Sequence, residues 1–386
     1  LILSYMSFAI GYIAGPFGAI FFGHIGDRKG RKVTMYASLL MMGISTSIIG
    51  ILPPAASAGV GVVIVLQLMR LAQCFGRGGT WGGGILMAYE NVPENKRSFY
   101  AAIPQIGLPI GFGLSSILIA VPTLLLPEDI FFTWGWRIPF LAAIILTLIV
   151  IRQKGEMMET EDYKKAQAKL EAEEAEGKKH KVGFIPMVKG YWKTLLLGCG
   201  TRWVDGTFYN IFIVWILSYC INWLGMPLIQ TYIITIIACI FKIPFTLFGG
   251  WCAQKLGNTR TFVIGALASA VLSIPTLKVI ELSKGNLAIT IIGIVLGWSI
   301  AYNLIWAVIS SLWSSYFETE VRYSGISFVY HVPSFLVAGM VPTICTLLIN
   351  YGKGDTIYVG IYSTVVALIS AACALALKAR HDRGEK

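Results

Sequence analysis

Asp205 is the one carboxylate that the sequence places deep inside a long apolar segment, and Arg202 lies three residues before it on the same helical face. An ionised group in such a segment costs on the order of a few kcal/mol unless it is paired or hydrated, so this position is a candidate for function. Burial favours the neutral carboxyl, whereas the neighbouring guanidinium favours the carboxylate. These opposed effects suit a group that takes up and releases a proton, and a permanent structural ion pair is the alternative.

Two further arginines indicate a site for an anion. Arg70 falls about 16 Å into its apolar segment, near the middle of a membrane, and Arg77 follows two helical turns later on the same face. A guanidinium at that depth must face a cavity or a partner, and its N–H donors suit a carboxylate. With Arg202 and Lys242 they make four buried cations against one buried acid, which favours an anionic substrate. Hydrogen bonding to backbone carbonyls of neighbouring helices is the alternative.

His331 is the one histidine within an apolar segment, and Pro333 close behind it frees a backbone carbonyl. Its imidazole could relay protons near neutral pH, and a neutral packing histidine is the alternative. Other polar and aromatic side chains in apolar segments could line a pocket, namely Gln105, Tyr209 and Asn210, and also Asn303, Trp298 and Trp306.

The elements that hold these residues are predicted to be membrane-spanning helices. Hydrophobic residues make up 56% of the chain and charged residues 13%, and the mean hydropathy is +0.70. A water-soluble surface could not be covered from that composition. Eleven segments have the length needed to cross a bilayer: 1–24, 33–53, 59–88, 98–121, 135–152, 192–219, 228–251, 261–281, 286–314, 325–350 and 356–378.

Residues 153–190 form the one long polar insertion, which we expect to be a solvated, partly helical cytoplasmic linker. It leaves five spans before it and six after it. Two six-helix bundles are the layout of transporters built from two similar halves. The sequence therefore predicts a bundle over 1–152 that lacks its first helix, the linker, and a second bundle over 191–386.

The turn at 23–32 carries five basic side chains and one carboxylate between two apolar segments. Most of the 31 Lys and Arg residues fall in loops on the same side, which the positive-inside rule assigns to the cytoplasm. Residues 250–258 repeat the glycines of this turn but have Gln254 in place of Asp27. The repeat supports two similar halves with an asymmetric distribution of charge.

Several classes of function are excluded by the sequence. The seven cysteines lie in apolar segments without a C-x-x-C spacing, so we expect neither a metal site nor a disulfide framework. The glycines near 76–84 are not followed by the residues of a phosphate-binding loop, and no cofactor motif or nucleophile constellation is present. The basic residues form no compact module, which argues against a nucleic-acid partner. An enzyme is disfavoured, and no cofactor is expected.

The residues of the turn resemble a known signature. Gly23, Asp27, Arg28, Gly30, Arg31 and Lys32 follow the pattern Gly-x-x-x-Asp-Arg-x-Gly-Arg-Lys, with Gly26 inside it, and this resembles the loop motif of the major facilitator superfamily. Segments 70–83, 99–105, 134–140 and 321–325 are similar to the metabolite:proton symporter family, whose members carry shikimate, proline/betaine or α-ketoglutarate. Arg202 and Asp205 followed by Tyr209 resemble the seventh helix of that family.

The chain also departs from the family pattern at three positions. Gly15 stands where the family has Arg before a proline, Thr80 stands where it has Glu, and Arg77 occupies a position that is usually apolar. The resemblance therefore implies the fold, but a substrate pocket that differs from those of other members.

The turn at 23–32 is expected to do more than orient the chain. Asp27 can lie near a helix N-terminus, where the helix dipole favours a negative charge. Arg28, Arg31 or Lys32 can pair with acids across the inner face when the carrier is open to the outside. This interpretation makes the turn a gate, and simple anchoring by positive charge is the alternative.

The expected protein is a secondary active transporter of the inner membrane. We expect symport of protons with a small organic acid or zwitterion, a monomer surrounded by lipid, and both termini of the full-length chain in the cytoplasm. Two alternatives remain: a transport-inactive sensor that retains the fold, or a facilitator that does not use protons.

Overall fold

The computed structural model describes residues 2–54, 59–153, 159–175 and 184–385, and every regular element in them is a helix. Ten helical runs in these residues are long and apolar enough to cross a membrane. The first predicted span, 1–24, lies in a further helix, α1 (Ile2–Lys29), which is not among those ten. The prediction of an all-helical membrane protein is confirmed.

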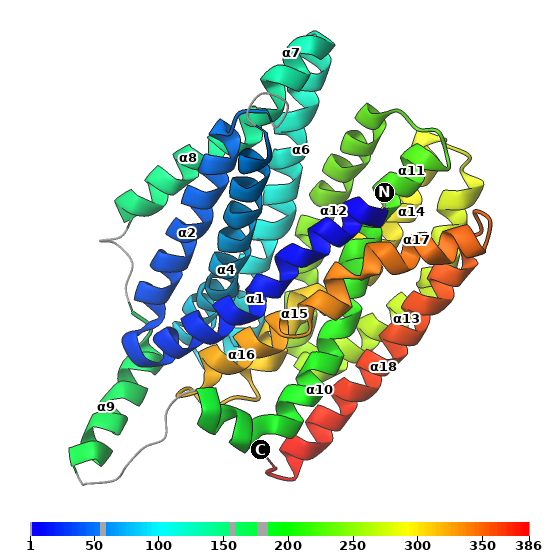
Figure 1. The fold of residues 1–386 in the computed structure, drawn as a ribbon. Coiled ribbons are helices and arrows are strands. Elements are labelled where there is room, and N and C mark those ends of the chain that lie inside the picture. The colour runs from blue at the N-terminus through cyan, green and yellow to red at the C-terminus, as the bar shows by residue number, and fades with distance from the viewer. Residues whose placement is uncertain (1, 55–58, 154–158, 176–183, 386) are drawn as a thin grey trace.

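The helices form two groups that stand side by side in Figure 1. Around α1, the first group contains α2 (Arg31–Ile51), α4 (Val60–Glu90), α5 (Arg97–Ala102), η2 (Pro104–Ile106), α6 (Gly107–Leu125), α7 (Glu128–Thr133) and α8 (Ile138–Arg152). The second contains α10 (Phe184–Asn210), α11 (Ile216–Asn222), α12 (Leu228–Leu256), α13 (Asn258–Leu282), α14 (Leu287–Ile294), α15 (Asn303–Ser314), α16 (Arg322–His331), α17 (Val341–Tyr351) and α18 (Ile357–Asp382).

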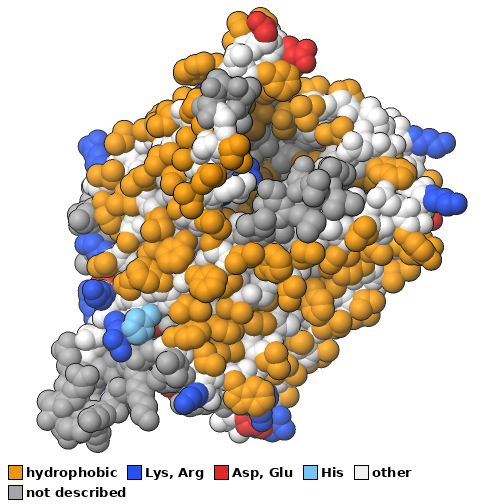
Figure 2. Space-filling model, viewed as in Figure 1, with side chains coloured by type: hydrophobic (Ala, Val, Ile, Leu, Met, Phe, Trp, Pro, Cys, Tyr) orange, Lys and Arg blue, Asp and Glu red, His pale blue; other side chains and the backbone are white. Residues whose placement is uncertain are grey.

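Several helix contacts join the groups. α1 packs along α16 and the segment after it, and α12 packs against α5 and α6. Figure 2 shows hydrophobic side chains over much of the surface that faces the viewer, with Lys and Arg mainly near its edges. This distribution suits a protein whose waist is surrounded by lipid.

Three described segments of the second group are π-helical: η5 (Ile211–Trp215), η6 (Val295–Ala301) and η7 (Phe335–Gly339). Each lies inside a membrane-spanning run, and η6 and η7 lie near the middle of theirs. A π-helical turn shifts the backbone hydrogen bonds by one residue and is frequent at functional sites. These segments change the direction of the side chains that follow them, including those of α15.

The described part of the linker is more ordered than the sequence indicated. Its helix α9 (Glu161–Ala175) confirms a partly helical segment, and Lys164 pairs with Glu161 at 2.8 Å. The expectation that the linker is simply solvated is wrong at its start, because Thr160 is fully buried. Residues 154–158 and 176–183 of the predicted linker lie outside the described residues.

Close contact of α1 with α4 depends on small residues. A Cβ atom added at Gly78 would overlap the backbone of Gly18 and Ala19, whereas one added at Gly84 of the same helix would meet nothing within 4 Å. Small residues let membrane helices approach to backbone contact.

We therefore expect Gly78→Ala to lower stability and Gly84→Ala to leave it unchanged or raise it slightly. Overpacking at such a contact costs about 1–3 kcal/mol, whereas alanine is the better helix former where space exists. Thermal unfolding of the purified variants in detergent measures the difference. Equal melting temperatures for the two variants would show that the close contact does not limit stability.

Candidate functional site

A cavity of about 450 Å³ lies between the two groups of helices. Its walls come from α1, α4, η2 and α6 on one side and from α10, α15, α16 and η7 on the other. The polar and aromatic residues that line it are Tyr12, Arg77, Trp81, Gln105, Phe112, Ser115, Arg202, Asp205, Tyr209, Trp306 and Tyr330. Five of the predicted site residues are thus brought together: Arg77, Gln105, Arg202, Asp205 and Tyr209.

Asp205 is held by two partners. Its Oδ2 pairs with Nη1 of Arg202 one helical turn away, and its Oδ1 accepts a hydrogen bond from the hydroxyl of Tyr302. The side chains of Asp205 and Arg202 are both almost completely buried. The carboxylate therefore borders a cavity with both oxygens engaged, and any proton that it accepts must compete with Arg202 or Tyr302.

Arg202 is also fixed from its other side. Its Nε donates to the carbonyl of Tyr330 at 3.3 Å, and its guanidinium lies 4.2 Å above the Tyr330 ring. The Tyr330 ring in turn stacks on Trp81 with centroids 4.1 Å apart. The stack of Trp81 on Tyr330 joins the two groups of helices, and Arg202 therefore lies near their boundary, beside the cavity.

Arg77 differs from Arg202 because no described carboxylate neutralises it. Its guanidinium lies 4.8 Å above the ring of Tyr12, and its buried Nε has no hydrogen-bond partner among the described residues. A cation–π contact compensates only part of the lost hydration of a buried cation. Arg77 is therefore an electrostatically unsatisfied cation that faces the cavity.

Gln105 ties the halves together at the cavity wall. Its Nε2 donates to the carbonyl of Trp306, and Nε1 of Trp306 donates to the carbonyl of Gln105, each at 3.1 Å. The sequence named both residues as possible lining residues, and both line the cavity. Tyr209 completes this wall with an edge-on contact to Phe112 at 5.8 Å.

The prediction for Arg70 is wrong. The sequence placed it buried beside Arg77, but Arg70 is exposed and is not part of the cavity wall. Seven residues of helix separate the two side chains by about 10 Å along the axis. At the level of Arg70, the neighbours Ile64 and Leu68 on α4 are also more than half exposed, so the cavity does not extend that far.

Asn210 and His331 are buried but do not line the cavity. The amide of Asn210 donates to the carbonyl of Gly206 at 2.8 Å, directly before a π-helical segment. The ring of His331 lies 4.8 Å from that of Tyr330, and a Cβ at Gly15 would be 3.3 Å from its Nδ1. A proton relay through His331 stays a prediction.

The turn at 23–32 meets the second group at the end of the molecule where α9 and the C-terminal end lie (Figure 1). The carboxylate of Asp27 accepts hydrogen bonds from the backbone N–H groups of Tyr323 and Ser324 at 3.2 and 3.0 Å. These groups belong to the first turn of α16, where unpaired N–H groups and the helix dipole favour an anion. Asp27 therefore lies at a helix N-terminus, as the sequence predicted.

Arg31 and Glu90 form the centre of this contact. Nε of Arg31 lies 3.4 Å from Oε2 of Glu90, and Nη2 of Arg31 donates to the carbonyl of Thr319 at 2.9 Å. Arg322 of α16 reaches the other oxygen of Glu90 at 3.0 Å. One buried carboxylate thus holds two arginines from opposite halves.

The glycines of the turn allow the close approach. Gly26 lies against the ring of Tyr323, where a Cβ would come within 2.6 Å, and Gly23 lies against the backbone of Ser324. Gly30 has a φ of 101°, which favours glycine. Arg28 contributes its carbonyl as the acceptor of a hydrogen bond from the Tyr163 hydroxyl at 3.0 Å.

The start of the linker, which the sequence did not connect to the turn, joins this cluster. The carboxylate of Glu159 accepts from the backbone N–H groups of Arg31 and Lys32 at 2.9 and 3.2 Å and so caps the N-terminus of α2. Oγ1 of Thr160 donates to Oε2 of Glu90 at 2.7 Å. We call the residues Asp27, Arg31, Glu90, Glu159, Thr160, Arg322 and the first turn of α16 the cytoplasmic cluster.

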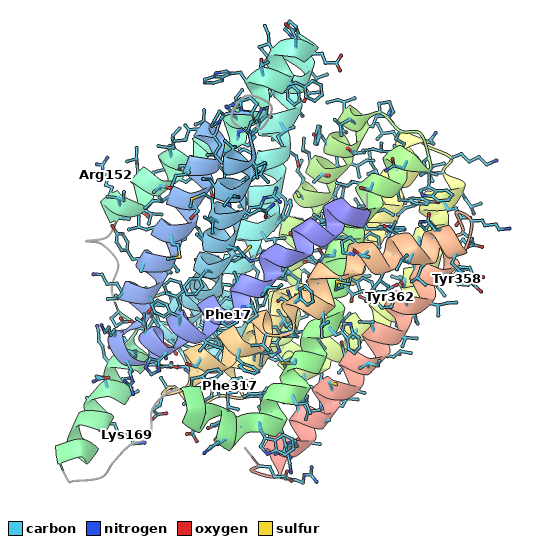
Figure 3. The ribbon with its side chains drawn as sticks, in the orientation of Figure 1. Phe17, Arg152, Lys169, Phe317, Tyr358 and Tyr362 are labelled. Atoms are coloured by element: carbon cyan, nitrogen blue, oxygen red, sulfur yellow. The ribbon has the colours of Figure 1, made fainter. Side chains whose placement is uncertain are left out.

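Around the cytoplasmic cluster, further contacts close the same end of the molecule. Asp162 of α9 pairs with Arg97 at 2.6 Å and lies 3.6 Å from Arg322. Lys169 and Phe317 mark this end in Figure 3, and Nε of Arg322 donates to the Phe317 carbonyl at 3.1 Å. These contacts thus help to join the two groups of helices at this end.

Replacing Glu90 by Gln should weaken the cytoplasmic cluster, because two buried arginines would lose their shared carboxylate. Breaking a buried pair in this way costs about 3–5 kcal/mol. We expect faster hydrogen exchange of the Tyr323 and Ser324 amides, measured by mass spectrometry on the purified protein. Glu94→Gln is the matched control, since the Glu94 side chain is 90% exposed and lies 3.8 Å from Arg97. Equal exchange in both variants would mean that Glu90 does not hold the cluster closed.

Comparisons with known proteins identify the family and the fold of the chain. The family model of the Major Facilitator Superfamily matches residues 3–342. The inner membrane metabolite transport protein YhjE of Escherichia coli K12 is 33% identical and aligned over 98% of this chain and 85% of its own. The shikimate transporter of the same strain is 30% identical over 97% and 84%, and the proline/betaine transporter of Salmonella typhimurium 27% over 99% and 76%.

Among solved structures, the proton:xylose symporter XylE bound to 6-bromo-6-deoxy-D-glucose has a TM-score of 0.74 at 17% identity, covering 96% of this chain and 85% of that one. An inward-open structure of the xylose transporter XylE from E. coli has a TM-score of 0.62 at 16% identity, covering 97% and 85%. These likenesses establish the fold. The chain is therefore an inner-membrane transporter and not an enzyme, and it belongs to the major facilitator superfamily.

Proposed function

We propose that the protein carries a small organic acid or zwitterion into the cell together with protons, by alternating access. The observation that carries the proposal is Arg77, a partly buried cation without a described carboxylate partner, in the same cavity as the Arg202–Asp205 pair. Secondary transporters bind their substrates near the middle of the membrane, between two similar halves. The cavity likewise has walls from both groups of helices.

The charges around the cavity favour a negative group on the substrate. Arg202 and Asp205 cancel each other when both are ionised, so the charge of Arg77 is left over. A carboxylate bound to Arg77 would remove this imbalance and could use two parallel hydrogen bonds. The aromatic walls, with Trp81 and Tyr330 stacked together, suit the apolar body of a small metabolite.

Proton coupling follows from the contacts of Asp205. A proton on its Oδ2 would remove the charge that pairs with Arg202, and the guanidinium would then be free to attract an anion. The cavity charge would rise by one, so protonation would strengthen anion binding. By thermodynamic linkage, a bound anion would strengthen proton binding to the same degree.

The relatives support the same class of cargo. Their printed names include a shikimate transporter and a proline/betaine transporter, that is, carriers of an organic acid and of zwitterions. The cytoplasmic cluster would serve as the inner gate, closed while the cavity is open to the opposite side and broken when the halves rock. Asp27, Arg31 and Glu90 would then set how readily the inner side opens.

Asp205→Asn should abolish accumulation driven by a pH gradient while leaving substrate exchange. For one proton per substrate, a gradient of one pH unit supports about tenfold accumulation, and without a titrating group the substrate would only equilibrate. The measurement is uptake by proteoliposomes of shikimate, aromatic acids, dicarboxylates and betaines, with and without the gradient.

Asp129→Asn is the matched control for Asp205→Asn, because Asp129 is an exposed carboxylate on α7. It should accumulate substrate as the unmodified protein does. If Asp205→Asn still accumulates substrate in response to the gradient, proton coupling through Asp205 is wrong. A transporter that ignores the gradient even before mutation would be the proton-independent facilitator.

Arg77→Gln should raise the KM for an anionic substrate by at least about tenfold, because truncating one partner of a buried charged contact costs about 2–5 kcal/mol. Arg70→Gln is the control on the same helix, since Arg70 is exposed and outside the cavity wall. Initial rates of uptake at varied substrate concentration give both values. Equal losses in the two variants, or exclusive transport of cationic compounds, would sink the anion site.

A further inference from the structure

Lys242 is a fully buried lysine that the proposed transport site does not use. It lies on α12, is 0% exposed and is not part of the cavity wall. Its Nζ is 2.9 Å from Oδ1 of Asn303 and 3.4 Å from the carbonyl of Trp298 in the π-helical segment η6. Both of these hydrogen-bond acceptors are uncharged.

Two aromatic rings complete the surroundings of Lys242. Nζ lies 4.5 Å from the centre of the Trp298 ring and 4.4 Å from that of Tyr302. No described carboxylate is within ion-pair distance of it. The carboxylate that interacts with Lys242 electrostatically is that of Asp205, and it accepts a hydrogen bond from the hydroxyl of the same Tyr302. Tyr302 therefore contacts both groups, the carboxylate with its hydroxyl and the amine with its ring.

The other ionisable groups around α12 are few. Cys239 lies one turn before Lys242 on the same helix, and Arg202 pairs with Asp205. The charged residues of the packed elements α5 and α13 lie at or near the ends of those helices, and they are Arg97, Arg260, Lys278 and Glu281. The charge state of Lys242 is thus governed by its uncharged cage and by Asp205.

Moving an ammonium group from water into a protein interior costs several kcal/mol of desolvation free energy. This cost is similar in size to the attraction that a carboxylate partner would provide, and Lys242 has no such partner among the described residues. Arginine cannot escape this penalty by losing a proton, whereas lysine can. An arginine at this position would stay charged, whereas the lysine can be either charged or neutral.

We propose that Lys242 is a second proton-carrying residue of this transporter, electrostatically coupled to Asp205 through Tyr302. Nζ binds its proton more tightly while Asp205 is ionised and less tightly when Asp205 is protonated. The only bonds that change are N–H on Lys242 and O–H on Asp205, and each group exchanges its own proton with water. The inference rests on the proposed function, because it assigns a second proton site to the same coupling.

The test counts protons without a substrate, so that it does not depend on the identity of the cargo. Purified protein in detergent is titrated between pH 6 and 9, where carboxylates and arginines of ordinary environment do not change charge. We expect the unmodified protein to bind one more proton over this range than Lys242→Met and one more than Lys242→Arg. Lys242→Arg keeps the positive charge at this position, so it still allows the comparison if Lys242→Met fails to fold.

Lys255→Met is the matched control, since Lys255 lies on the same helix but is exposed. It should bind as many protons over the range as the unmodified protein. In an Asp205→Asn background, the extra proton should leave at lower pH, because the attracting carboxylate charge is gone. Equal proton counts for the unmodified protein and both Lys242 variants, or a release that Asp205→Asn does not shift, would overturn the inference.

These outcomes are separable from those of the transport assays. Loss of gradient-driven uptake in Asp205→Asn with no extra proton at Lys242 would leave the proposed function standing and refute the second proton site. An extra proton at Lys242 in a protein that ignores the pH gradient would refute symport and show that the buried amine titrates without it.

Discussion

The buried ion pair of Arg202 and Asp205 is the interaction on which the rest of this structure depends. Two opposite charges in an apolar interior are tolerated only if each has partners, and Asp205 has Arg202 and the hydroxyl of Tyr302. Because this pair borders a cavity that Arg77 also lines, a proton on Asp205 would alter the charge that the proposed substrate meets. In the proposed function, binding of an anion and binding of a proton are therefore coupled.

The helices that carry this site also carry the cytoplasmic cluster, which we propose as the inner gate. α1 bears Tyr12 at the cavity and Asp27 at the cluster, and α4 bears Arg77 and Glu90. Glycine contacts between α1 and α4 make these two helices a close-packed unit. A rigid tilt of such a unit would move both ends together, which provides a physical route from an occupied cavity to the opening of the inner gate.

The sequence predicted the helical membrane fold because apolar segments of spanning length are a strong signal, and it found Asp205 and Arg202 because charges are rare inside such segments. It placed Arg70 in the site wrongly, since helical spacing shows that two residues share a face but not how far a cavity extends. From the sequence alone, Tyr302 and Trp81 could not be distinguished from aromatic residues that only pack between helices. The contacts of Glu159 and Thr160 with the turn were missed because a polar linker gives no periodic signal of where it docks.

The most direct measurement of the central claim is the number of protons that the purified transporter takes up when it binds its cargo. Saturating amounts of a transported acid are added to the protein in weakly buffered solution near pH 7, and a pH-sensitive dye reports the change. Coupling through the Arg202–Asp205 pair predicts an uptake that approaches about one proton for each acid bound at this site. Binding of the acid without proton uptake across the range of pH in which transport occurs would contradict it.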